Sequence, residues 1–335
     1  MSAEPWRLLS LAPATPERVL AWFDGIPSLD VGFPVERSAS AVRAALPGVD
    51  IVVTDWSNAL RIDAAEAAVA DRLSFVMSPS VGLDNIDLPV LTAAGVVVAN
   101  TAGINSASVA EWCLGATFAV ARSLVWVDRE VRAGRWPQLE LPERGSTELG
   151  GRRVGVVGFG AVGSRVARLF AGIGCDVAYW TRRPRDEDAA AGAAWLPLPA
   201  LAERSDILVV NVALTSETRG LVSAEVLGAL PRGAIVVDAS RGGIVDHVAL
   251  LGAVESGRLR GAAIDVFETE PLPIDSPLRR SERILLSSHA AATTGQAIGR
   301  IFALVGDNVR RAIAGEPVLS VVNGLGPRVA RRVGH

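Results

Sequence analysis

A glycine-rich turn near the middle of the 335-residue chain constrains the fold more than any other feature of the sequence. The apolar run 153–158 leads directly into Gly-Phe-Gly-Ala-Val-Gly at 158–163, and an Ala-, Val- and Leu-rich segment, 162–173, follows at once. The apolar run predicts a buried strand, and the segment after it predicts a helix. A strand, a tight turn and a helix in this order predict one unit of a parallel α/β sheet.

The spacing Gly-x-Gly-x-x-Gly gives each glycine a separate role. Gly158 permits the tight turn, Gly160 lets the backbone approach a pyrophosphate, and Gly163 lets the helix pack close to the strand. The N–H groups at the helix start, including those of Ala161 and Val162, attract phosphates together with the positive end of the helix dipole. The pattern predicts a dinucleotide site. The alternative is a tight turn without a ligand, but the flanking strand and helix disfavour it.

The end of the next expected strand, 177–180, bears on which dinucleotide is bound. In NAD-binding units an Asp or Glu near this point accepts a hydrogen bond from the ribose 2′-OH. Here Thr181, Arg182 and Arg183 follow the strand, and the nearest acid, Asp176, lies at its start. A hydroxyl and two guanidinium groups suit a 2′-phosphate better. NADP is therefore favoured, and NAD remains possible if these arginines form only a solvated loop.

Apolar runs alternate with segments of helical period both before residue 100 and after residue 153, which predicts two parallel-sheet domains of the α/β class. The segment 106–133 has no Pro and predicts one long helix that leaves the first domain. A last helix, 294–314, is expected to pack back on the first domain. The other expected strands are 8–11, 51–54, 74–78, 96–99, 207–212, 234–239, 262–265 and 284–288, and the other expected helices are 39–46 and 63–70.

Composition excludes several classes of protein. The net charge is −3 and the basic residues are all Arg, so neither nucleic-acid binding nor lysine Schiff-base chemistry is expected. The two cysteines have no metal-ligand or disulfide spacing, and no metal site is expected. No apolar run reaches the roughly 18 residues that a membrane helix needs. The first residues lack the basic and apolar regions of a secretory signal, so we expect a cytoplasmic protein without membrane attachment.

One of the three histidines stands out as a catalytic candidate. His335 is the last residue, and His247 lies at a helix start where a surface role is expected. His289 follows the apolar run 284–288 and precedes a stretch of small residues. Strand ends in such sheets face the ligand crevice, so His289 is well placed for proton transfer beside a bound nicotinamide.

Together these segments resemble the D-isomer-specific 2-hydroxyacid dehydrogenase family along nearly the whole chain. The resemblance implies a Rossmann cofactor domain, 103–290, inserted in a discontinuous flavodoxin-like substrate domain, 1–102 and 291–335. It also implies a homodimer formed through the cofactor domain. Besides the glycine turn, the similar segments are 80–87 (substrate loop), 237–246 (substrate arginine), 265–271 (acidic segment) and 288–289 (catalytic histidine).

The resemblance also implies roles for individual residues. Arg241 would hold the substrate carboxylate and carbonyl, with the backbone N–H groups of Val81 and Gly82. His289 would be the general acid in reduction and the base in oxidation, and Glu270 would orient it and favour its protonated form. Besides the glycine turn and 181–183, the cofactor site would include Val212, Ala213, Thr218, Ala239, Asp265 and His289.

Two functions remain open from the sequence. The segment Glu-Pro-Leu-Pro at 270–273 and the Arg-bearing loop resemble most closely NADPH-dependent glyoxylate/hydroxypyruvate reductases, which implies reduction of a small 2-oxo acid. The alternative is a binding protein or co-regulator that senses nicotinamide cofactors on the same fold with little catalysis.

Overall fold

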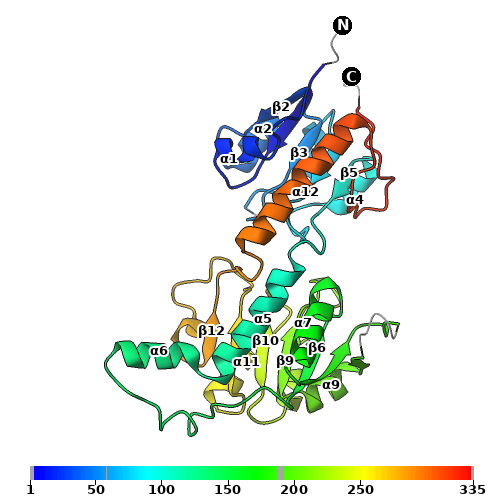
Figure 1. Cartoon of the computed structure of the whole chain (residues 1–335). Coiled ribbons are helices and arrows are strands. Elements are labelled where there is room, and N and C mark those ends of the chain that lie inside the picture. The colour runs from blue at the N-terminus through cyan, green and yellow to red at the C-terminus, as the bar shows by residue number, and fades with distance from the viewer. Residues whose placement is uncertain (1–3, 58, 187–191, 333–335) are drawn as a thin grey trace. The chain divides into compact units, whose positions relative to one another are not determined.

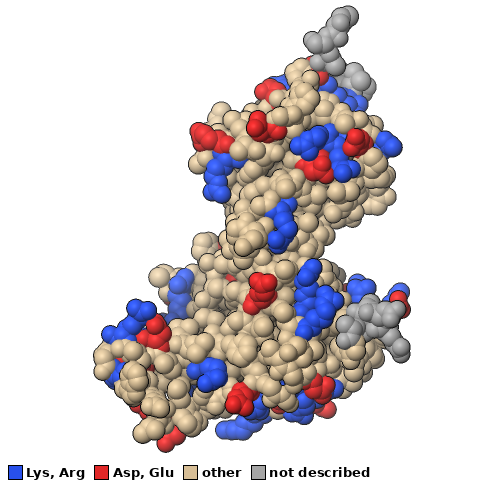
Figure 2. Space-filling model, viewed as in Figure 1, with Lys and Arg blue, Asp and Glu red and all other residues tan. Residues whose placement is uncertain are grey.

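The structure is a computed structural model that describes residues 4–57, 59–186 and 192–332, and its chain divides into two compact units (Figure 1). Unit 1 comprises Met1–Asn105 and Thr294–His335, and unit 2 comprises Ser106–Thr293. No helix in the described ranges is both long enough and apolar enough to span a membrane. Figure 2 shows acidic and basic side chains interspersed on the visible face.

Unit 1 contains a five-stranded parallel sheet with the order β2-β1-β3-β4-β5. This is the flavodoxin-like doubly wound order. The strands are Trp6–Ser10 (β1), Leu29–Gly32 (β2), Ile51–Val53 (β3), Phe75–Met77 (β4) and Val97–Ala99 (β5). The helices are Pro16–Ala21 (α1), Ala39–Ala45 (α2), Ala64–Val69 (α3), Leu88–Ala93 (α4) and Gly295–Ala314 (α12).

Helices cover both faces of this sheet because its strands are apolar on both sides. Val19 of α1 and Val305 of α12 share one core cluster with residues of β1, β3, β4 and β5. Val42 of α2 and Leu91 of α4 share another cluster with the side chains that point to the opposite face. The helix α12, distant in sequence, therefore belongs to the core of unit 1.

The segment after α12 binds the open edge of this sheet. The N–H of Val322 donates to the carbonyl of Val98 (2.9 Å), and Asn323 exchanges side-chain hydrogen bonds with the backbone of Val98 and Val96. An edge strand with unpaired backbone groups is prone to add further strands, so this pairing protects β5.

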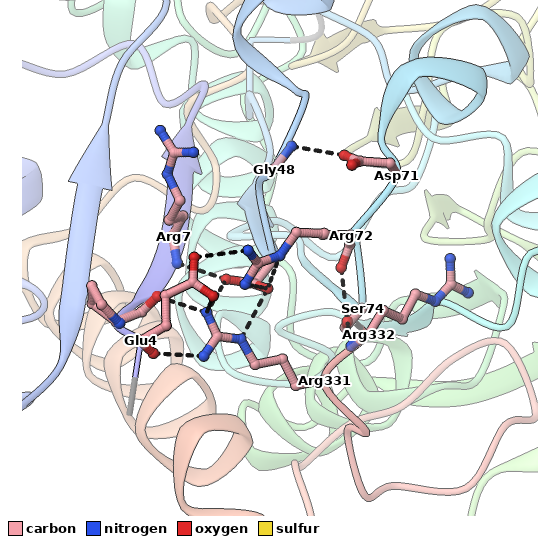
Figure 3. Close-up of polar contacts among 10 residues, drawn as sticks. Glu4, Arg7, Gly48, Asp71, Arg72, Ser74, Arg331 and Arg332 are labelled. Carbon is pink, nitrogen blue, oxygen red and sulfur yellow. Dashed lines mark hydrogen bonds and ion pairs between the residues drawn. The ribbon is translucent and has the colours of Figure 1, made fainter. Parts of the chain in front are cut away.

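An ion-pair network then fixes the end of the described chain (Figure 3). The Asp50 carboxylate is fully buried and lies 3.0 Å from Arg331 and 3.2 Å from Arg72. Glu4 contacts Arg72 at 2.9 Å. The first strand and the last described residues are thus joined through one buried carboxylate.

Unit 2 contains a seven-stranded sheet with the order β12-β11-β10-β9-β6-β7-β8, and all its strand pairs are parallel. The order corresponds to a Rossmann sheet with one added strand. The strands are Arg153–Val157 (β6), Asp176–Trp180 (β7), Ala194–Trp195 (β8), Ile207–Val210 (β9), Ile235–Asp238 (β10), Gly261–Ile264 (β11) and Ile284–Leu286 (β12). The helices are Ser106–Ala121 (α5), Leu124–Arg132 (α6), Ala161–Gly172 (α7), Leu198–Arg204 (α9), Ala224–Ala229 (α10), His247–Glu255 (α11) and a 3₁₀ turn at Pro277–Arg280 (η1).

The core of unit 2 has three layers. Helices α5 and α7 cover one face of the sheet, where Val156, Val209 and Val237 point. Helices α9, α10 and α11 cover the other face, where the alternate strand residues point. This burial on both faces explains the continuous apolar runs in the sequence and leaves the carboxyl ends of the strands to carry polar groups.

The prediction of one long helix over 106–133 is wrong, because α5 ends at Ala121 and α6 begins at Leu124. Ser123 between them has a left-handed backbone conformation with φ of 51°. The end of α5 is held by outside donors: the N–H of Thr147 and the Arg260 guanidinium both donate to the carbonyl of Ala121, at 3.1 and 2.7 Å. These bonds take the place of the next helical turn.

Candidate active site

The residues predicted to bind the cofactor and to act in catalysis lie mostly at one edge of the unit 2 sheet. In a parallel sheet all strands end at the same edge, where ligands bind. The residues that follow the strands there are Gly158 after β6, Thr181 after β7, Val212 and Ala213 after β9, Ala239 and Arg241 after β10, Asp265 and Glu270 after β11, and His289 after β12.

The glycine turn has the geometry that a dinucleotide requires. Gly158 has φ of 93°, and a Cβ on it would lie 2.8 Å from the carbonyl oxygen of Asn211. A Cβ on Gly163 would collide with the carbonyl of Gly158, so the helix lies directly against the turn. Gly160, in contrast, is exposed at the start of α7 with no described heavy atom within 4 Å of its Cβ position.

This open position suits a pyrophosphate. The first N–H groups of an α-helix have no partner within the helix. Those of Ala161, Val162 and Gly163 therefore offer hydrogen bonds beside Gly160. The turn fits a bound dinucleotide on this geometry.

The end of β7 carries cations and no carboxylate. Thr181 donates a hydrogen bond to the carbonyl of Arg183 at 2.6 Å, and Arg182 forms an exposed ion pair with Glu217. Arg183 is exposed and pairs with no carboxylate among the described residues. Asp176 begins the strand and forms an ion pair with Arg204, so it lies at the opposite end of β7.

Thr218 stabilises the loop after β9. It is 5% exposed, its hydroxyl donates to the carbonyl of Ala213 at 2.6 Å, and the hydroxyl accepts from the N–H of Thr215 at 2.7 Å. Val212 is half-buried and Ala213 is exposed. The Thr218 side chain is thus occupied within the loop and stabilises its conformation beside Val212 and Ala213.

His289 and Glu270 form a direct pair. The Nδ1 atom of His289 lies 2.8 Å from Oε2 of Glu270. The other carboxylate oxygen, Oε1, accepts from the backbone N–H of Phe267 at 2.9 Å. Both oxygens of Glu270 are therefore fixed, and the Nε2 atom of the imidazole is the nitrogen left for a substrate.

The charges around Glu270 keep it ionised. Burial raises the pKa of Glu270, but the hydrogen bonds from His289 and Phe267 and the positive charges of His289 and Arg241 outweigh it. The net effect holds the pKa of this carboxyl below its ordinary value. The carboxylate thus remains an anion that accepts a hydrogen bond at Nδ1 and orients the imidazole ring.

Asp265 holds the turn that carries His289. Its buried carboxylate accepts from the N–H groups of Ala290 (2.8 Å) and Ala291 (2.9 Å) and from the hydroxyl of Ser287. Its carbonyl accepts from the N–H of His289 at 2.8 Å. His289 itself has φ of 56°, a conformation that costs about 1 kcal/mol or more in a non-glycine residue and needs such support.

Arg241 lies two residues beyond Ala239 in the loop after β10. Its guanidinium donates to the carbonyl of Ser240 at 2.9 Å. It is half-buried, and its charge contributes to the lowered pKa of Glu270. These observations bring a guanidinium, a carboxylate and an imidazole to adjacent strand ends.

Val81 and Gly82 belong to unit 1 and follow β4. The carbonyl of Val81 accepts from the Asn100 side chain at 2.8 Å, and the carbonyl of Gly82 accepts from the Ser80 hydroxyl at 2.8 Å. Their own N–H groups donate to no acceptor among the described residues. Two such N–H groups suit an anion such as a carboxylate.

The expected surface role of His247 is wrong. It does begin α11, but its side chain is only 12% exposed and faces Asp238. His335 lies outside the described residues. No cluster of His, Cys, Asp and Glu suited to a metal is found in the ranges that the structure describes.

A separate cavity of about 330 Å³ lies at the opposite edge of the unit 2 sheet, where the strands begin. It is lined by residues such as Arg152, Asp206 and Ala234, which precede β6, β9 and β10. It contains none of the predicted site residues.

The description of the family model that matches residues 114–291, more than half of the chain, is "D-isomer specific 2-hydroxyacid dehydrogenase, NAD binding domain". The chain belongs to the D-isomer specific 2-hydroxyacid dehydrogenase family. It is therefore an oxidoreductase that uses a nicotinamide cofactor and interconverts 2-hydroxy and 2-oxo acids.

Relatives within this dehydrogenase family differ in substrate. The chain is 36% identical over 268 residues to a glyoxylate reductase of Korarchaeum cryptofilum, covering 78% of this chain and 80% of that protein. It is 38% identical over 281 residues to a D-3-phosphoglycerate dehydrogenase of Mycobacterium leprae, which covers 84% of this chain but only 52% of that protein. The chain thus spans about half the length of that phosphoglycerate dehydrogenase.

Solved structures show the same two-domain fold. A crystal structure of an NADPH-dependent glyoxylate/hydroxypyruvate reductase from Sinorhizobium meliloti, in complex with NADP and malonate, is similar with a TM-score of 0.84 and 28% sequence identity. The match covers 99% of this chain and 100% of that chain. The expected α/β class with two parallel-sheet domains is confirmed.

Proposed function

We propose that this dehydrogenase is an NADPH-dependent reductase of small 2-oxo acids of the glyoxylate/hydroxypyruvate type. In this proposal unit 2 binds the cofactor and unit 1 contributes part of the substrate site. The observation that carries the proposal is the hydrogen-bonded pair of His289 and Glu270 in the sheet that holds the glycine turn and Arg241. This set supplies a proton donor, its orienting anion and a carboxylate-binding cation.

The proposed mechanism assigns one task to each residue. Arg241 binds the substrate carboxylate, because a planar guanidinium offers two parallel N–H groups to two oxygens. The N–H groups of Val81 and Gly82 add hydrogen bonds to the same anion. The bound cofactor supplies the hydride that reduces the carbonyl carbon.

Proton transfer is the task of His289. As the carbonyl oxygen gains negative charge, the Nε2–H of the imidazolium donates its proton to it and the product hydroxyl forms. Glu270 stays ionised and compensates the imidazolium charge through Nδ1. In the oxidation direction the neutral imidazole accepts the same proton.

The proposed preference for NADP rests on the end of β7. A carboxylate there would repel a 2′-phosphate, and the residues present are Thr181, Arg182 and Arg183. Arg182 would have to leave its ion pair with Glu217, which costs little because both side chains are largely exposed. Arg183 forms no ion pair with a carboxylate among the described residues.

Asp265, Ala239, Val212 and Ala213 would face the nicotinamide half of the cofactor in this proposal. The carboxylate of Asp265 already accepts three hydrogen bonds within the turn. A carboxylate has about four acceptor positions, so one remains for a carboxamide N–H. Thr218 would act indirectly, by holding the loop of Ala213.

Steady-state kinetics test the function. The oxidation of NADPH and of NADH is measured with glyoxylate, hydroxypyruvate, pyruvate and bulkier 2-oxo acids. We expect turnover of the small acids with a higher kcat/KM for NADPH. Turnover of none of them, while the cofactor binds, would contradict the reductase and favour a nicotinamide-sensing binding protein.

Two sets of variants test the assigned residues. His289→Ala should lower kcat by about 10²-fold or more, the size of a general acid contribution, and leave NADPH affinity unchanged. Arg182→Ala with Arg183→Ala should weaken NADPH much more than NADH. Equal weakening of the two cofactors would contradict the preference for NADP.

We also propose a homodimer formed through unit 2. Its surface carries exposed apolar residues on α6 and in the segment after it, namely Leu124, Val125, Val131, Trp136 and Leu139. Exposed apolar side chains grouped along one segment are typical of protein interfaces. Light scattering of the purified protein should give twice the chain mass, and Leu139→Glu with Trp136→Glu should give monomers.

A further inference from the structure

His247, a histidine whose side chain is only 12% exposed, lies next to the strand end that leads to Arg241. The Nε2 atom of His247 is 3.6 Å from Oδ2 of Asp238, which is fully buried. In the part of the chain that the structure describes, neither atom has a hydrogen-bond partner. A buried carboxylate oxygen without a hydrogen-bond partner is costly, and the imidazole of His247 is the polar group that lies beside it.

The other oxygen of Asp238 organises the loop. Oδ1 accepts from the backbone N–H of Ser240 at 3.1 Å and from the Ser240 hydroxyl. The carbonyl of Ser240 in turn accepts from the guanidinium of Arg241. Asp238 thus faces His247 with one oxygen, at 3.6 Å, and holds the Arg241 loop with the other.

The second contact of His247 leads toward Glu270. Its ring packs edge-on against Phe267, with 6.0 Å between the ring centroids. The N–H of Phe267 donates to Oε1 of Glu270, the partner of His289. A Cβ on Gly242 would collide with the carbonyl of Phe267, so the two loops also touch through their backbones.

We propose that His247 is a positioning residue that keeps the segments 238–241 and 265–270 in a fixed position relative to each other. It fixes the first through Asp238 and the second through Phe267. The inference rests on the proposed function of Arg241 as the carboxylate-binding residue. Substrate binding is sensitive to displacements of about 1 Å, so a guanidinium held by one short loop needs such support.

The kinetic test compares His247→Leu with His247→Gln. Leucine fills space but leaves Asp238 unpaired, whereas the glutamine amide is able to donate to Oδ2. We expect H247L to raise the KM for glyoxylate about tenfold, with kcat and the KM for NADPH within about twofold of wild type, and H247Q to restore most of the loss. Val254→Ala, a buried change on the same helix, is the matched control for lost stability alone.

Two kinetic outcomes would overturn the inference. One is an H247L enzyme with the kinetic constants of wild type. The other is a KM for glyoxylate that rises equally in H247L and V254A, since that would show a loss of stability without a positioning role.

A second measurement does not depend on turnover. The urea unfolding midpoints of H247L, Asp238→Asn and the double variant form a double-mutant cycle. If the two side chains interact, the double variant should lose clearly less than the sum of the single losses. Additive losses would show that the pair does not form and would overturn the proposal. If the wild-type protein reduces no 2-oxo acid, the proposed function is contradicted. The double-mutant cycle would still decide whether His247 and Asp238 interact.

Discussion

The carboxylate of Glu270 is bonded through both oxygens, one to the His289 ring and one to the backbone of Phe267. Replacing this carboxylate by an amide of the same size removes the charge beside the imidazole without opening space. For Glu270→Gln we expect kcat to fall by about 10²-fold, because a neutral amide no longer favours the proton-donating imidazolium. Steady-state reduction assays measure this. Glu268→Gln in the same loop is the control, and equal effects of the two changes would contradict the role of Glu270.

The lowered pKa of Glu270 also has a consequence for stability. A carboxyl whose pKa is lower in the folded state stabilises the fold above its unfolded pKa and loses this contribution as pH falls through the folded pKa. The ordinary value is 4.5 and the folded value lies below it. The difference in unfolding free energy between wild type and E270Q should therefore be larger at pH 7 than at pH 3. Urea unfolding at the two pH values measures it, and a constant difference would contradict the assignment.

At the residue scale, the sequence identifies functional groups that directly follow a strand. It misses groups whose surroundings are formed by residues distant in sequence. His289, Glu270 and Arg241 each occur in a recognisable segment at a strand end, and the structure places them at one edge of the sheet. His247 looks like a surface residue because its neighbours Asp246 and Val248 are exposed. Its burial depends on Asp238 and Phe267, whose positions are set by sheet order rather than by local sequence.

At the element scale, the turn between β6 and α7 contains two glycines at which an added methyl group should have different effects, one on stability and one on cofactor binding. In Gly163→Ala the Cβ meets the carbonyl of Gly158, so the helix must shift. In Gly160→Ala the Cβ points to open space and φ is −85°, which alanine adopts freely. We expect G163A to lose about 1–3 kcal/mol of stability. G160A should keep its stability but bind NADPH at least about tenfold more weakly, because the methyl occupies the space proposed for the pyrophosphate.

Thermal unfolding and NADPH titration of both variants check this prediction. Tight NADPH binding by G160A would place the pyrophosphate elsewhere. A G163A protein as stable as wild type would show that the close approach of helix and strand is not required.

The boundary between α5 and α6 shows what the sequence does not reveal about elements. Nothing in 106–133 breaks a helix, since the segment contains no Pro. The break exists because Arg260 and Thr147, distant in sequence, donate to the end of α5. The sequence also gives no signal for the short strand β2. Its exposure alternates over only four residues, which is too few for a period to be recognised.

At the scale of the whole molecule, the chain returns to its first unit after the second is complete. Helix α12 fills one core cluster of unit 1, the residues after it pair with the edge strand β5, and Arg331 reaches Asp50. Sequence patterns predict the helix, but the later residues 315–332 show no periodicity. Their structure depends on hydrogen bonds to a sheet formed more than 200 residues earlier, such as that between Asn323 and Val98.

The ion pair between Arg331 and Asp50 should therefore stabilise unit 1 as a whole. Asp50 is fully buried, and removing one partner of a buried pair is strongly destabilising; here Arg72 remains, so we expect Arg331→Met to cost about 1–3 kcal/mol. Arg332→Met is the matched control, because among the described residues the polar contact of Arg332 is that of its backbone N–H with Ser74, at 3.1 Å (Figure 3). Urea unfolding measures the loss, and hydrogen exchange at the N–H of Val322 reports whether the pairing with β5 loosens. If R331M and R332M unfold at the same urea concentration, the ion pair of Arg331 and Asp50 does not stabilise unit 1. The pairing with β5 alone must then hold the last described residues in place.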